Sequence, residues 1–262
     1  MNRQAQSAVL FLLGAALLHA GATDLYLRYV KAGLRPLLLA AGAVLIVTAL
    51  ATAWYERRRT RGGHGDGGGD GGGSGHRARG GHGDGSGRGG GHAHPEPRVS
   101  WLLILPLLAL ILVAPPALGS YSATRTGTAL QEPLAYPSLS AADPLPLSVV
   151  DYAGRAVYDH GRTLAGRTVR LTGFVALDHA GTPYLVRMAL NCCAADAQPV
   201  KVGLAGRIPP VLQPDTWLAV TGVYTPRVVR DPVNGGPIPF LEVTDARPVP
   251  TPRDPYDESW NN

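Results

Sequence analysis

The sequence reads TVRLTGFV over Thr168–Val175 and PYLVRMAL over Pro183–Leu190. Apolar and polar residues alternate in the first run, and both runs are rich in β-branched and aromatic residues, which is typical of strands. The connecting residues Asp178–Thr182 contain an aspartate and a glycine that favour a turn. The two runs therefore predict a β-hairpin.

Three further runs with the length of a strand follow this hairpin. They cover residues 199–204, 217–224 and 240–243, and a brief helical connection is expected at 208–212. Gly173 and Gly222 fall where the strands of a small barrel must bend sharply. Five short strands in roughly 100 residues predict a small all-β domain, a five-stranded barrel of the oligonucleotide/oligosaccharide-binding type, called OB-like below.

The barrel domain is expected to cover residues 148–250. It opens with a short amphipathic helix at 148–160, with Val149, Tyr152 and Ala156 on one face. A proline-rich stretch at 121–147 has neither the period of a helix nor that of a strand, and it is interpreted as an extended stalk. Residues 251–262 form a tail.

The sharpest local pattern is NCCAAD over Asn191–Asp196, directly after the second strand. Cys192, Cys193 and Asp196 form a donor set for zinc or copper(I), provided that the backbone turns there. Three structural alternatives stay open: thiols buried as small hydrophobic groups, a vicinal disulfide with a redox role, and an aspartate that caps a turn.

Three other residues of the domain could join such a metal site, although their distance in the sequence does not show that they approach it. They are His160, Asp178 and His179.

Three long apolar runs lie in the first 120 residues, at about 5–25, 36–55 and 99–120. A helix of about 20 apolar residues matches the thickness of the hydrocarbon core of a bilayer. We therefore expect a transmembrane hairpin in residues 1–55 and a third span at 99–120. The alternative for the first run is a cleaved signal peptide, because Arg3 precedes it and Ala20-Gly21-Ala22 has the form of a cleavage site.

Basic residues near the span ends predict the orientation of the chain in the membrane. More of them lie at the N-terminus and after Tyr55 than in the loop between the first two runs. This distribution predicts a multi-pass protein with its N-terminus and the segment after Tyr55 in the cytoplasm. The C-terminal domain is then extracytoplasmic.

Residues 56–98 hold 18 of the 34 glycines and five of the eight histidines. So little apolar surface cannot offset the entropy of chain ordering, and the segment is expected to be a disordered linker. Its imidazoles could capture metal ions loosely, or the histidines could be solubilising residues of a glycine-rich tract. The histidines in question are His64, His76, His82, His92 and His94.

The sequence argues against two classes of function. Its rings at Phe174, Tyr184 and Trp217 would also fill a barrel interior, and its basic residues are dispersed, so no nucleic-acid surface is expected. It has no serine elbow, phosphate loop or zincin motif, and His179 is the sole candidate base near the thiols. We therefore expect a protein that is not an enzyme.

The chain resembles a bacterial family of permease subunits of uncharacterised function, which have N-terminal membrane spans, a His-rich linker and a C-terminal domain. The resemblance rests on the hairpin through Tyr29 and Pro36, on residues 169–175, and above all on Arg187 followed by CCAADA at 192–197. Trp217 before residues 220–222 and the stretch 252–256 also fit.

The resemblance implies a non-catalytic accessory subunit of the bacterial cell membrane that partners a multispan permease. It also implies a link to metal homeostasis, with zinc as the expected ion. The alternative expectation is an extracytoplasmic metal-binding or thiol redox protein that acts through Cys192 and Cys193.

Overall fold

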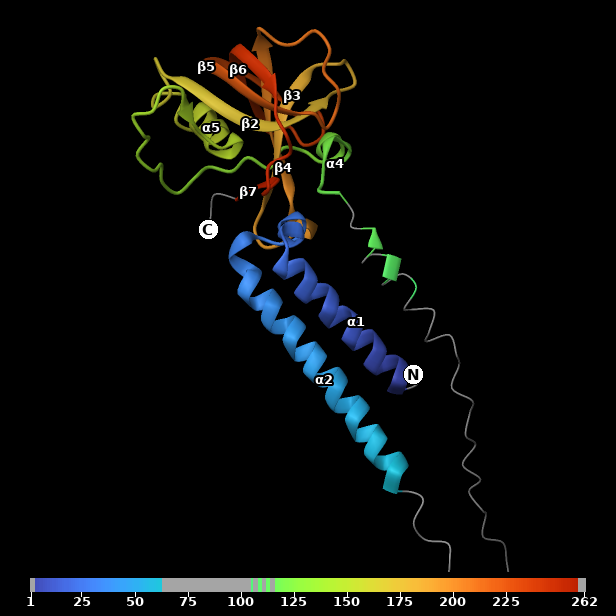
Figure 1. The fold of residues 1–262 in the computed structure, drawn as a ribbon. Helices are drawn as coiled ribbons and strands as arrows, with labels where there is room; N and C mark the ends of the chain where they lie inside the picture. Colours follow the sequence, from blue (N-terminus) through green and yellow to red (C-terminus); the bar gives the residue numbers. More distant parts are fainter. Residues whose placement is uncertain (1–2, 63–104, 106–107, 110–111, 114–115, 259–262) are drawn as a thin grey trace, which may run out of the picture. The chain divides into compact units, whose positions relative to one another are not determined.

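The computed structural model describes residues 3–62 and 116–258, together with residues 105, 108–109 and 112–113. The chain divides into two compact units. The first contains residues 1–18 and 40–113, and the second contains residues 19–39 and 114–262. Figure 1 shows the ribbon, and each unit is described by itself.

The first unit contains most of α1 (Arg3–Ala22) and of α2 (Arg35–Gly62), whose facing ends at residues 19–22 and 35–39 belong to the second unit. Two helical stretches, Ala5–Ala22 and Ala32–Arg58, are long and apolar enough to cross a membrane. The helices approach closely at Gly14, where an added methyl group would lie 2.7 Å from the Ile46 side chain. Small residues allow such close packing of helices in lipid.

The structure extends α2 to Gly62, past the expected end of the second span at Tyr55. The third expected span, 99–120, lies outside the described residues apart from a few isolated positions and its last residues. The linker from residue 63 to 98, with its five histidines, also lies outside the described residues.

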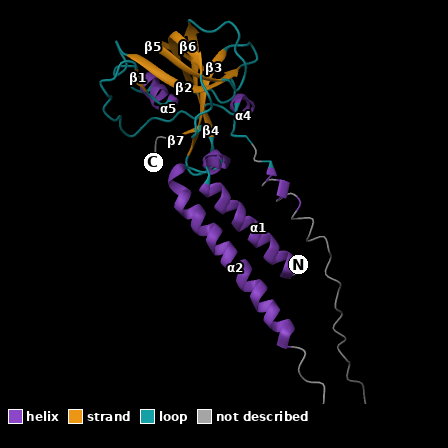
Figure 2. Ribbon diagram, viewed as in Figure 1, coloured by secondary structure: helices purple, strands orange, loops and turns teal. Residues whose placement is uncertain are grey.

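The second unit contains a closed barrel of five strands, which confirms the prediction of a C-terminal β-barrel. The strands are β2 (Thr168–Leu177), β3 (Pro183–Leu190), β4 (Gln198–Gly206), β5 (Trp217–Arg230) and β6 (Pro237–Pro248). Their order around the barrel is β2-β3-β4-β6-β5, and β5 pairs with β2 to close it. All of these pairs are antiparallel except β4–β6. Figure 2 separates the strands from the surrounding helices.

Two glycines let strand backbones approach closely. A methyl group at Gly173 would lie 2.7 Å from the Val186 carbonyl oxygen, and one at Gly222 would collide with the Glu242 carbonyl oxygen. The ladder between β5 and β6 also shifts register between Thr221 and Gly222. Both glycines therefore occupy positions where a side chain would meet the backbone of a neighbouring strand.

Helix α5 (Val149–Val157) packs on the barrel and completes its core. The Ser148 side chain accepts a hydrogen bond from the Asp151 amide, which satisfies a backbone donor in the first turn. Val149, Tyr152 and Ala153 are fully buried, and the Tyr152 hydroxyl donates to the Phe240 carbonyl oxygen at 2.6 Å. Burial of each large apolar side chain stabilises the domain by about 1.5–3 kcal/mol.

The connections differ from the sequence-based expectations in two places. The described segment between β4 and β5 has irregular backbone and no helix at 208–212. Most of its residues remain at least partly exposed, so packing does not favour one repeating conformation. The stalk is not simply extended, because it contains α4 (Ser120–Arg125) and β1 (Leu145–Pro146), and β1 pairs with β2.

Candidate functional site

The loop after β3 folds around the Asp196 carboxylate. A short 3-10 helix, Ala194–Asp196, turns the chain back toward the end of the strand. Asp196 Oδ1 accepts a hydrogen bond from the Asn191 amide at 3.0 Å, and Oδ2 accepts one from the Cys192 amide at 3.0 Å. The Cys193 amide also donates to Oδ2, at 3.4 Å. Asp196 thus caps a turn, as one of the sequence alternatives proposed.

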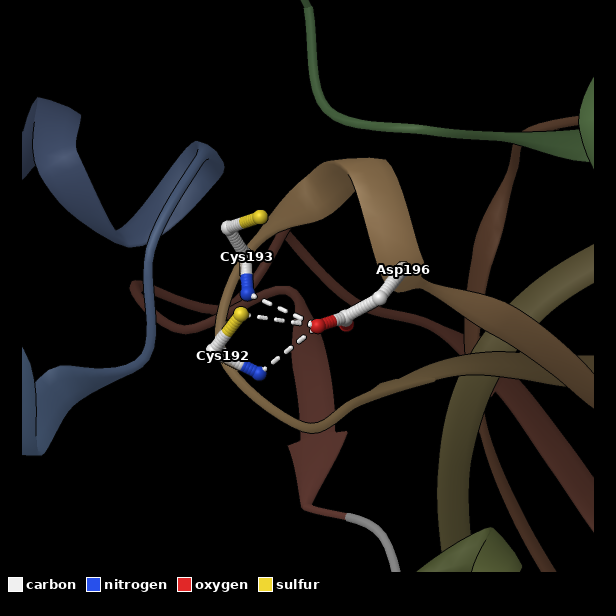
Figure 3. Close-up of side chains that lie close together, drawn as sticks. All are labelled: Cys192, Cys193 and Asp196. Carbon is white, nitrogen blue, oxygen red and sulfur yellow. Dashed lines mark hydrogen bonds between the residues drawn. The ribbon is translucent and has the colours of Figure 1, made fainter.

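This turn brings the donor atoms of Cys192, Cys193 and Asp196 to within 4.8 Å of one another. Figure 3 shows the Cys192 thiol beside the Asp196 carboxylate, to which it donates at 2.9 Å through Oδ2, while the Cys193 sulfur points away from the carboxylate. Both thiols are free, and Cys192 is exposed while Cys193 is half-buried. The pair therefore lies at the surface and is not packed into the core.

The carboxylate and the thiol affect each other's protonation. The hydrogen bond to Asp196, with that to Cys193, raises the pKa of the Cys192 thiol to about 11. Partial burial raises the pKa of the Asp196 carboxyl, but the Cys192 thiol and the backbone amides of residues 191–193 lower it by more. Near neutral pH the loop consequently holds a carboxylate and a protonated Cys192, so a metal ion would have to displace that proton.

The loop between α1 and α2 pairs with this cysteine loop, although more than half of the chain separates them. The Lys31 amide donates to the Cys192 carbonyl oxygen at 3.0 Å, and the Ala194 amide donates to the Tyr29 carbonyl oxygen at 2.7 Å. Val30 and Cys193 form an isolated antiparallel bridge between these bonds. Both loops belong to the second unit, and Figure 3 shows the interhelical backbone beside the thiols.

Two tail contacts hold the same interhelical loop. The Tyr256 hydroxyl donates to the Arg28 carbonyl oxygen at 3.0 Å. Arg253 forms an exposed ion pair with Asp24. Sequence analysis did not anticipate any of these contacts, since backbone pairing between distant loops leaves no residue-type signature. The available signals are the inclusion of Tyr29 and of the stretch 252–256 among the residues of the resemblance.

The other candidate ligands lie away from the cysteine loop along the chain. Asp178 and His179 belong to the turn before β3, whereas the thiols follow the other end of that strand. Eight residues at about 3.3 Å each separate the two ends by about 25 Å. His160 lies beyond the end of α5, where its carbonyl oxygen accepts from the Tyr224 hydroxyl. Among the candidate ligands that the structure describes, it brings together the three residues of the cysteine loop.

Arg187, which precedes the cysteine pair in the resemblance, connects strand β3 to the C-terminal tail. Its guanidinium donates to Asp257 Oδ1 at 2.9 Å and to the Tyr256 carbonyl oxygen at 2.9 Å. Asp257 Oδ2 in turn accepts from the Val149 amide at the start of α5. The guanidinium also lies 5.0 Å from the centre of the Trp217 ring. Arg187 thus ties β3, the tail and α5 together beneath the cysteine loop.

A comparison with family models identifies the region that contains this arrangement. Residues 143–257 match the DUF1980 C-terminal domain. The match runs from the residues before β1 into β7 (Tyr256–Glu258), so the stretch that is similar to this domain includes the whole barrel and the cysteine loop. It supports the resemblance as far as an uncharacterised family and carries no information on a permease. No curated protein and no solved structure matches the chain.

Proposed function

We propose that this chain is a non-catalytic accessory subunit of a multispan permease in the bacterial cell membrane, and that it binds a thiophilic metal ion, zinc first, on the outer side. The observation that carries the proposal is the convergence of Cys192, Cys193 and Asp196 in one exposed turn. Two thiolates and a carboxylate suit zinc, and three protein ligands leave a fourth position open. An open position fits a site that receives an ion and passes it on.

The hydrogen bonds around Asp196 indicate how the loop would respond to an ion. In the metal-free loop, Oδ2 accepts from the Cys192 thiol and from two backbone amides. Cys192 must lose its proton to become a ligand, and Asp196 must then share its oxygens between those amides and the ion. The backbone that would adjust is the same backbone that Tyr29 and Lys31 bond.

This pairing supports a subunit role because it links the site to the expected transmembrane hairpin. Residues 29–31 lie between α1 and α2, so a shift of the cysteine loop bears directly on the connection between the two helices. On α2 the side chains of Val44, Val47 and Leu50 are more than half exposed. Such a surface suits lipid or the spans of a membrane partner.

The proposed sidedness is compatible with the same contacts. A loop that pairs with the barrel must lie on the barrel's side of the membrane. The arginine distribution places both outside the cytoplasm if the third apolar run spans the bilayer. The strand order, with one parallel pair between β4 and β6, further supports an OB-like barrel as the external domain.

Metal binding can be tested on the full chain in detergent. All five linker histidines are first changed to serine, because they could bind metal independently of the loop. In this background we expect about one zinc per chain after dialysis, and at least tenfold weaker binding in C192S, C193S and D196N. H179A, at the opposite end of β3, is the matched control and should bind like its parent. Equal zinc content in all variants would exclude the site.

The subunit role needs a separate experiment. The tagged chain, expressed at its native level, should co-purify with a multispan membrane protein from mild detergent. Recovery of a monomer without any partner, even after crosslinking, would contradict the proposal.

The link between the interhelical loop and the metal site is tested by a K31P variant. It removes one amide that bonds the cysteine loop and should weaken metal binding severalfold without removing a ligand.

A thiol redox role is the second candidate, and the adjacent free thiols are the observation that favours it. The raised pKa of Cys192 argues against this role, since a reactive redox thiol usually has a lowered pKa. Thiol counting distinguishes the two functions. A redox protein would lose two thiols on mild oxidation and regain them on reduction, whereas a metal site would protect both thiols when zinc is bound.

A further inference from the structure

A pocket lies at the end of β3 that is away from the cysteine loop. Its volume is about 500 Å³, within the range of small-molecule sites. Seven parts of the barrel unit line it: α4, the end of β2, the β2–β3 turn, the start of β3, β4, the β5–β6 turn and the start of β6. Their side chains include Thr124, His179, Tyr184, Lys201, Val233 and Ile238.

The position of this pocket follows from the strand order. In barrels with this order, ligands bind on the face of the second and third strands, between the loops that join strands one to two and four to five. Here those strands are β3 and β4, and the loops are the turns at 178–182 and 231–236. Tyr184 and Lys201 come from the two strands, and His179 and Val233 come from the two turns.

The charges of the pocket decide which ligands it can take. Lys201 Nζ lies 2.7 Å from the fully buried Asp231 carboxylate, and this pair leaves no net charge. The remaining charged side chain in the lining is Asp178, which accepts hydrogen bonds from two amides of its own turn and from the Tyr184 hydroxyl. A pocket without excess positive charge does not suit phosphate, a nucleic acid or another polyanion.

The rest of the lining combines apolar and polar side chains, a combination that suits a sugar. Ala176, Leu177 and Ile238 provide an apolar wall, and the Tyr184 ring adds a flat amphipathic surface. His179 is an exposed residue of the pocket lining, so its imidazole can bond a ligand. Apolar surface for the C–H faces of a sugar ring therefore lies beside polar groups for its hydroxyls.

We propose that this pocket binds a short, uncharged oligosaccharide segment. The site lies about 25 Å along β3 from the cysteine loop and does not depend on metal binding. Helix α4 forms one wall, with Ala123 and Thr124 in the lining, and its first residue is anchored by two hydrogen bonds from Ser120 to Asp215. A bound sugar would thus contact the segment that leads from the expected third span into the barrel.

The test measures binding of chitotetraose and maltotetraose, two neutral tetrasaccharides, to the full chain in detergent by titration calorimetry and saturation-transfer NMR. We expect saturable binding of at least one sugar. V233W should weaken it at least tenfold because the indole fills the pocket, and Val233 is exposed enough to accept the larger side chain. H179A removes a polar partner without adding bulk and should weaken binding severalfold.

The matched control is V211W, since Val211 is 76% exposed and lies outside the pocket lining. V211W and C192S should bind the sugar like the unaltered chain, which separates this site from the proposed metal site. The proposal is overturned if neither sugar binds saturably. It is also overturned if V233W and H179A, shown to be folded by their melting transitions, bind as tightly as V211W, or if a sulfated tetrasaccharide binds more tightly than the neutral ones.

Discussion

The two ends of β3 satisfy their polar side chains in opposite ways. At the cysteine end, the Asp196 carboxylate accepts hydrogen bonds from three consecutive amides and a thiol of its own loop. At the other end, the Asp231 carboxylate is buried and paired with Lys201, which lies on a different strand. The first arrangement is local and at the surface, so its thiols and carboxylate remain accessible to an ion or a reagent. The second joins distant residues in the interior, so it stabilises the fold.

The largest effect should come from breaking the buried pair. K201M leaves the Asp231 carboxylate buried without a cation, which typically costs about 3–5 kcal/mol. Urea unfolding of the chain in detergent, followed by tryptophan fluorescence, measures the loss. The double variant K201M/D231N removes the charge as well and should recover much of it. If K201M alone unfolds at the same urea concentration as the wild type, the pair has no structural role.

Changing the cysteine end should alter reactivity more than stability. In D196N the carboxylate that raises the pKa of Cys192 is absent, so this pKa should fall from about 11 toward its ordinary value. A fall of two units increases the thiolate fraction about a hundredfold at pH 7.5, while the lower basicity reduces nucleophilicity about tenfold. Because the thiol is exposed and screened, we expect metal-free D196N to alkylate up to about tenfold faster.

The alkylation experiment is best made in a C193S background, so that a single thiol reacts. D178N removes an analogous turn aspartate at the opposite end of β3 and should leave the rate unchanged. An equal acceleration in both variants would mean that general loosening of the barrel, rather than the Asp196 hydrogen bond, controls Cys192.

Acid should reduce the stability that the carboxylate at each end of β3 contributes, and the reduction should be larger for the paired Asp231 than for Asp196. Burial raises the pKa of Asp231, yet the Lys201 ammonium and the amides of Val233 and Thr128 lower it overall. A carboxyl whose pKa is lower in the folded state stabilises the protein above about pH 4, and that stability is lost as the pH falls through the folded-state pKa. Urea midpoints between pH 6 and pH 3 should therefore decrease, and the decrease should be smaller in K201M.

The smallest effect is expected at the exposed ion pair of the tail. Arg253 and Asp24 have side chains that are 82% and 52% exposed, so solvent screens their attraction. R253A should change the free energy of unfolding by at most about 1 kcal/mol. A loss comparable to that of K201M would show that the tail holds the interhelical loop more firmly than surface electrostatics allow.

The barrel could be predicted because its information is local. Alternation over Thr168–Val175 predicts a strand directly, and the structure has β2 there. The glycines at 173 and 222 are expected at unusual backbone positions, and both lie close to the backbone of a neighbouring strand. The connection at 208–212 was wrong because a few apolar residues resemble a helical turn, while packing on the domain determines their backbone. The prediction of an extended stalk was wrong for a related reason. Its proline-rich sequence has no strand period, yet Leu145 and Pro146 pair with β2.

The candidate site was predictable in its residues but not in its surroundings. The spacing of Cys192, Cys193 and Asp196 indicated a donor set, and the turn that gathers them follows from the preference of aspartate for nearby amides. The buried Lys201–Asp231 pair and the pocket beside it join residues from separate strands and turns. Such long-range groupings depend on barrel closure, which one sequence does not encode in any short pattern.

The bridge between Val30 and Cys193 also sets an order of events during synthesis. The hairpin leaves the ribosome first, and its loop must wait for its partner strand, which at typical translation rates takes roughly ten to thirty seconds. During that interval the cysteine loop that bonds the amide of Lys31 and the carbonyl of Tyr29 has not yet been synthesised. The loop between α1 and α2 can therefore adopt its final pairing only after most of the barrel has been made.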